Sequence, residues 1–201
     1  MKRFATTLGL ALCPVLAAAQ PFPATYSVTG ITANDVLNVR GGPSLGAPVL
    51  GEIGSKDLNI EVLGLSADGK WGKVGLPEGN GWVAMSYLQA TLQPDDNTIP
   101  RPLSCRGTEP FWSVSLSIGG AQYNSPDTGA IALTVKHEAV APQGFLIELE
   151  EGPALTHTLI VTRETCSDGM SDRIYGFAIR MFSKDPNGNA SVHGCCTLDH
   201  R

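Results

Sequence analysis

The sequence predicts an all-β protein with two small antiparallel modules and a proline-rich linker between them. Glycine occurs 23 times and proline 14 times in 201 residues without a collagen-like period, which is typical of short strands separated by turns. Apolar and polar residues alternate along several segments, and no helical period interrupts them. Hydrophobic residues make up 42% and charged residues 16%, so the chain can bury a core and is not disordered.

The charge pattern excludes nucleic acid as a partner. The formal net charge is −5, and no basic run follows Lys2 and Arg3. Binding to phosphate backbones requires a basic patch, which this chain lacks. No stretch reaches the 18 apolar residues of a membrane span.

Residues 1–19 have the order of a secretory signal peptide. Lys2 and Arg3 precede an apolar stretch over residues 4–16, and residues 17–19 are three alanines. We expect cleavage after Ala19 and a periplasmic or secreted protein. Cys13 raises the alternative of a lipid anchor, but its bulky neighbour Leu12 and the following Pro14 do not suit lipoprotein processing.

Residues 92–102 (LQPDDNTIPRP) are predicted to be the linker. The segment holds three prolines and two adjacent aspartates, a composition typical of extended, solvated chain. Residues 24–91 before it contain no cysteine, whereas residues 103–201 contain four. This asymmetry favours two modules that fold independently.

The first module has short strands at regular spacing. Residues 37–40 alternate before a glycine-rich break at residues 41–44, residues 58–62 alternate again, and the turn at residues 67–70 precedes a strand that begins at Trp71. The pieces LNVRGGPS, PVLGEI, DLNIEVLG, DGKWGKV and GNGWVAMSYL resemble, in this order, a bacterial SH3 domain over residues 26–88. The resemblance implies a compact β-barrel that occurs in exported proteins and often binds cell-wall peptides.

Trp71, Trp82 and Tyr87 are the candidate ligand-binding residues of this module. Their rings could form an aromatic groove for an extended peptide. The alternative is that the tryptophans fill a small core, which we favour for Trp82. Trp71 adjoins an Asp-Gly turn and is the better surface candidate.

The second module is predicted to be an antiparallel barrel or sandwich. Trp112, Val114, Leu116 and Ile118 share one face of a strand, and residues 131–135, 145–149, 159–161 and 175–179 repeat this alternation. The pieces CRGTEPFWSV, CSDGMSDRIYGF and HGCC resemble a family of uncharacterised bacterial envelope proteins. That resemblance implies a fold class and a compartment but no activity.

Two stretches of this module contain further candidate ligand-binding residues. Glu109 lies beside large aromatic residues, including Trp112, and could anchor a ligand. Asp168, Asp172 and Arg173 occupy a loop rich in serine and glycine. Here we favour a structural role, because Asp and Ser side chains cap turns and the stretch lacks the ligands of a calcium loop.

The four cysteines of the mature chain predict two disulfides. Adjacent cysteines would close a cramped ring, so each of Cys195 and Cys196 is expected to pair with one of Cys105 and Cys166. The alternative is zinc or copper held by these thiolates with His193 and His200. We expect no metal and no cofactor.

The chain contains no recognised catalytic motif, neither G-x-S-x-G nor H-E-x-x-H, P-loop or C-x-x-C. We therefore expect a non-catalytic envelope protein whose first module binds cell-wall peptide, with a second ligand or a partner protein on the other module. The alternatives are a periplasmic metal-binding protein and an accessory of a cell-wall hydrolase.

Overall fold

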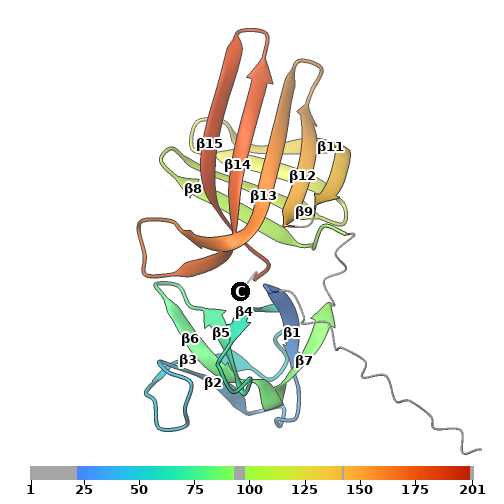
Figure 1. Cartoon of the computed structure of the whole chain (residues 1–201). Coiled ribbons are helices and arrows are strands. Elements are labelled where there is room, and N and C mark those ends of the chain that lie inside the picture. Colours follow the sequence, from blue (N-terminus) through green and yellow to red (C-terminus); the bar gives the residue numbers. More distant parts are fainter. Residues whose placement is uncertain (1–21, 93–97, 142, 200–201) are drawn as a thin grey trace, which may run out of the picture.

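The computed structural model describes residues 22–92, 98–141 and 143–199, and each predicted module has its own sheet (Figure 1). The expected signal peptide, its cleavage after Ala19, and Cys13 lie outside these residues. Within them the all-β prediction is confirmed, since the one helical element is the short 3-10 helix η1 (Met85–Tyr87). No helix in the described part of the chain is long and apolar enough to cross a membrane.

The N-terminal module is a seven-stranded antiparallel sheet in the order β3-β2-β6-β5-β4-β1-β7. Its strands are β1 (Ala24–Val28), β2 (Val36–Arg40), β3 (Val49–Gly54), β4 (Ile60–Leu65), β5 (Trp71–Gly75), β6 (Asn80–Ala84) and β7 (Leu88–Leu92). Ile53, Ile60, Val62, Val74 and Val83 form the centre of its core and are fully buried. Because strand side chains alternate, the residues between these core positions lie on the outer face of the sheet.

The C-terminal module is a closed antiparallel barrel of eight strands, in the order β10-β11-β12-β13-β14-β15-β8-β9. The strands are β8 (Leu103–Thr108), β9 (Phe111–Ser117), β10 (Gly120–Ser125), β11 (Gly129–Ala141), β12 (Gly144–Glu151), β13 (Leu155–Ser167), β14 (Ile174–Asp185) and β15 (Gly188–Thr197). Closure leaves no unpaired edge strand in this module. The apolar residues of the segments that were predicted to alternate form the inner wall of the barrel.

The prediction that Ile118 faces the inside of the barrel is wrong. Trp112, Val114 and Leu116 of β9 are buried in the core, but Ile118 is 96% exposed. The strand ends at Ser117, and the chain reverses at Gly119 before β10 begins. Ile118 therefore lies in the turn, where the alternation no longer applies.

The predicted cysteine pairing is confirmed. Cys105 of β8 is bonded to Cys196 of β15, and Cys166 of β13 is bonded to Cys195 of the same β15. The bridges span 91 and 29 residues of sequence. Adjacent residues of one strand point to opposite faces, so Cys195 and Cys196 reach different partners.

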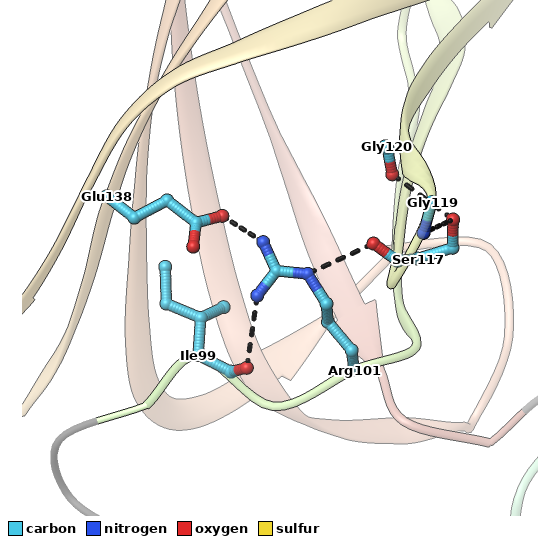
Figure 2. A network of polar contacts seen from close by, with 6 residues as sticks. All are labelled: Ile99, Arg101, Ser117, Gly119, Gly120 and Glu138. Carbon is cyan, nitrogen blue, oxygen red and sulfur yellow. Dashed lines mark hydrogen bonds and ion pairs between the residues drawn. The ribbon is translucent and has the colours of Figure 1, made fainter.

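The chain that enters the barrel is fixed by Arg101 (Figure 2). Its guanidinium donates to the carbonyl oxygens of Ser117 (3.1 Å) and Ile99 (3.3 Å) and forms an ion pair with Glu138 of β11. The Ile99 side chain is buried in the barrel core. The last residues of the segment assigned to the linker therefore pack against the barrel.

Candidate binding surfaces

A row of one aromatic and two basic side chains crosses the outer face of the N-terminal sheet. Arg40 of β2 and Lys73 of β5 are both cross-strand neighbours of Trp82 of β6. The residues that precede or follow them in their strands point into the core: Val39, Val74 and Val83. We call Arg40, Trp82 and Lys73 the basic–aromatic row.

The contacts within the row leave both cations available to a ligand. The Lys73 ammonium lies 5.4 Å from the centroid of the Trp82 ring, a cation–π distance. The Arg40 guanidinium donates one hydrogen bond to the Ala47 carbonyl oxygen (2.9 Å). Neither cation takes part in the salt bridges found between described residues. Such a row can bind a carboxylate with its cations and an apolar group with the indole face.

The expected exposures of the two tryptophans are reversed in the structure. Trp71, predicted to be the surface residue, is 8% exposed, whereas Trp82, predicted to be in the core, is half-buried on the outer face. Both rings lie on the face opposite to Val74, and the backbone N–H of Trp71 donates to the Ser66 hydroxyl oxygen (3.0 Å). The core of the sheet is filled by smaller apolar residues, so it does not need Trp82.

Tyr87 does not join this row. It lies in η1, is 41% exposed and contacts the loop around Gly30. The three aromatic residues therefore do not form the single groove that the sequence suggested. Sequence reasoning missed Arg40 and Lys73, although the two-residue spacing of Lys73 from Trp71 could have placed it on the outer face.

The turn between β8 and β9 borders a recess of about 630 Å³ at the mouth of the barrel. Phe111 is 58% exposed and lines this recess together with Arg106, Asn124 and Pro126. Trp112 also borders it but is 4% exposed, and its indole N–H points at Gly107. The predicted ligand residue Trp112 is thus mainly a core residue, whereas its neighbour Phe111 presents an open ring.

A smaller neighbouring recess of about 180 Å³ brings together two of the predicted residues. Glu109 and Asp168 both line it, together with Arg106 and His193. Glu109 is exposed, so the aromatic residues beside it in the sequence do not enclose it. Arg106 borders both recesses and is the residue that sequence reasoning missed here.

The loop around Asp168 is held by hydrogen bonds to the Asp168 carboxylate. The Asp168 carboxylate accepts hydrogen bonds from the N–H groups of Met170 and Ser171 (both 3.0 Å) and from the Tyr175 hydroxyl (3.2 Å). Burial opposes ionisation of this carboxyl group, but the hydrogen bonds outweigh it and hold its pKa below the usual value. The carboxylate is therefore occupied by its own loop.

Arg173 stays in contact with this cap, because its backbone N–H donates to the Ser171 hydroxyl oxygen (3.2 Å). Asp172 is exposed, while the Arg173 guanidinium lies 4.8 Å from the Tyr175 ring centroid. The same guanidinium packs against Gly75 of the N-terminal sheet. Arg173 therefore belongs to the contact between the two modules.

His157 lies inside the barrel rather than in an open site. Its Nδ1 is 2.8 Å from the Ser183 hydroxyl and its Nε2 is 3.3 Å from the Glu151 carboxylate. The ring stacks on Tyr123 and is 4% exposed. With both ring nitrogens partnered and the ring enclosed, His157 has the contacts of a structural residue.

The thiolate site of the metal alternative is not formed in this structure, because the four cysteines among the described residues are bonded in disulfides. His200 lies outside the described residues. Within the described part of the chain, no three His, Cys, Asp or Glu residues gather in a way that could hold a metal ion.

Comparison with known proteins identifies one part of the chain. Residues 35–89 match the family model described as bacterial SH3 domain. No curated protein and no solved structure matches the chain significantly. The match covers β2 to β6 and η1 and therefore contains the whole basic–aromatic row.

Proposed function

Because residues 35–89 form a bacterial SH3 domain, a binding domain, we propose that this is a non-catalytic envelope protein that binds cell-wall peptides through the basic–aromatic row. The observation that carries the proposal is the position of Trp82 between Arg40 and Lys73 on the outer sheet face. Cell-wall peptides carry free carboxylates and small apolar side chains. A planar guanidinium and an ammonium bind carboxylates, and an indole face packs on apolar groups.

The compartment supports the proposal. Both disulfides need an oxidising environment, which a periplasmic or secreted protein has and a cytoplasmic one lacks. The expected signal peptide at residues 1–19 would deliver the chain there. An accessory of a cell-wall hydrolase would use the same binding surface and remains the alternative.

Co-sedimentation with purified peptidoglycan sacculi tests the row. The full mature chain is compared with Trp82→Ala and Lys73→Gln, and with Lys70→Gln as the matched control on an exposed hairpin outside the row. We expect about tenfold weaker binding for Trp82→Ala, weaker binding at high salt for the parent, and no change for Lys70→Gln.

Near-ultraviolet circular dichroism verifies that each variant is folded. Absence of sedimentation by the parent chain would overturn the proposed function. Equal sedimentation of the parent and Trp82→Ala would leave the function standing but remove the row as its site.

For the second module we propose a ligand site in the recess beside Phe111. An exposed ring in a recess that Arg106 and Asn124 also line offers stacking and hydrogen bonding together. Titration with soluble muropeptides from digested sacculi, followed by NMR, tests this site. We expect shifts near Phe111 that disappear in Phe111→Ala, with Ile118→Ala as the exposed control; no shifts there would remove the site.

A further inference from the structure

A carboxyl group of the SH3 domain is buried against the C-terminal end of the barrel. Glu61 of β4 is 2% exposed, and its strand neighbours Ile60 and Val62 point into the core on the opposite face. Its Oε2 lies 2.5 Å from the Thr197 hydroxyl, and its Oε1 accepts a hydrogen bond from the Leu198 N–H (2.9 Å). These two contacts join residues that are 136 and 137 positions apart.

The surroundings of Glu61 disfavour its charge. Both hydrogen-bond partners are neutral groups. Of the charged groups around it, Asp199 of the tail disfavours ionisation and Arg173 of the β13–β14 loop favours it, while its cross-strand neighbour on β1 is the uncharged Thr25. Burial is the largest influence and, despite the two hydrogen bonds, raises the pKa of Glu61 to about 7.

The heavy-atom positions also suit the protonated group, once the Thr197 hydroxyl hydrogen turns away from Glu61. A protonated Oε2 can donate to the Thr197 hydroxyl oxygen, and Oε1 can still accept from the Leu198 N–H. The ionised group keeps two acceptors but places a negative charge in the buried contact, close to Asp199 and offset only in part by Arg173.

We propose that Glu61 is a protonation-dependent latch that holds the SH3 domain on the barrel when it is neutral and loosens this contact when it is ionised. Glu61 lies on the outer face of the sheet, as the basic–aromatic row does, because Ile60 and Val62 on either side of it point into the core. Asn80, which also contacts the barrel, is two residues from Trp82 in β6. Opening the contact exposes more of this face.

The raised pKa of Glu61 determines whether a rise in pH strengthens or weakens the contact between the modules. A carboxyl group whose pKa is higher in the closed state than in the open state favours closure at low pH. This stabilisation is complete below the usual carboxyl range and is lost as the pH rises through about 7.

Hydrogen exchange of the Leu198 and Ile174 amides in the full mature chain tests the latch. Protection factors, corrected for intrinsic exchange rates, are compared at pH 5.5 and pH 8.5. We expect protection to fall about tenfold or more at the higher pH, while Ile179 inside the barrel stays unchanged. Equal protection at the two pH values would overturn the proposal.

Two variants assign the effect to Glu61. Glu61→Gln mimics the neutral group and is expected to remove the pH dependence. Glu52 is an exposed residue of β3, and Glu52→Gln is expected to retain the pH dependence. Thr197→Val removes a bond that lowers the pKa of Glu61, so the midpoint should move to higher pH. An unchanged pH dependence in folded Glu61→Gln, or an unchanged midpoint in Thr197→Val, would overturn the proposal.

Discussion

Asn80 of the SH3 domain and Ile174 of the barrel exchange two hydrogen bonds. The Asn80 amide nitrogen donates to the Ile174 carbonyl oxygen (3.1 Å), and the Ile174 N–H donates to the Asn80 amide oxygen (2.7 Å). A side-chain amide thus satisfies both polar backbone groups of a residue 94 positions away. Together with the Glu61 contact, this pairing connects two modules that the sequence suggested were independent.

The first prediction concerns a tight contact between the modules at Gly176. A Cβ at Gly176 of β14 would collide with the Pro23 ring and lie 3.2 Å from Leu63 of the SH3 domain. Gly176→Ala should therefore separate the modules at a cost of about 1–3 kcal/mol. We expect the Ile174 amide to lose exchange protection. Gly188→Ala is the control, because its Cβ would meet nothing within 4 Å; equal behaviour of the two variants would contradict this prediction.

The features that could be predicted from the sequence, such as the barrel strands and the disulfides, depend on local patterns of residues. Alternation in segments such as residues 145–149 identified barrel strands, because an antiparallel sheet with one buried face imposes a period of two. Cysteine spacing predicted the bridges to Cys195 and Cys196, since two adjacent cysteines have few partners with acceptable geometry.

The sequence could not predict what depends on contacts distant in the chain. Glu61 occupies a polar position of an alternating strand and reads as solvent-exposed, yet the tail at Thr197 covers it. The basic–aromatic row likewise requires the pairing of β2 with β6, which no local pattern specifies. Trp71 and Trp82 were misassigned because a large ring can be buried on either face of a small sheet.

The second prediction is that reduction destabilises the barrel selectively. The bridges span 91 and 29 residues, and loops of this size contribute on the order of 3–4 kcal/mol each by restricting the unfolded chain. Thermal unfolding with and without reductant should show a lower Tm for the barrel and little change for the cysteine-free SH3 domain. Four free thiols in the unfolded, unreduced protein would contradict the bridges.

The third prediction concerns the Arg101 clamp. Arg101→Met removes the ion pair with Glu138 and leaves two carbonyl oxygens, those of Ile99 and Ser117, without this donor. We expect a loss of about 1–3 kcal/mol in urea unfolding and faster proteolysis just before the barrel. Lys136→Gln breaks a more exposed ion pair, with Glu150, and should cost about 0–1 kcal/mol. A loss for Arg101→Met no larger than that of Lys136→Gln would show that the clamp does not hold the segment.

The last prediction concerns how the stability of the folded protein falls at acid pH. The pKa of Asp168 is lowered in the folded protein, so the stability gained from its ionised form is present above the usual carboxyl pKa and is lost as the pH falls through the lower, folded value. Asp168→Asn cannot accept all of the bonds from Met170, Ser171 and Tyr175, and should lower stability at pH 7 while weakening its dependence on pH below about 4. Asp172→Asn, in the same loop but exposed, should keep the parent profile. Urea unfolding at several pH values measures all three proteins, and an acid profile of Asp168→Asn parallel to that of the parent would show that the carboxylate does not organise the loop.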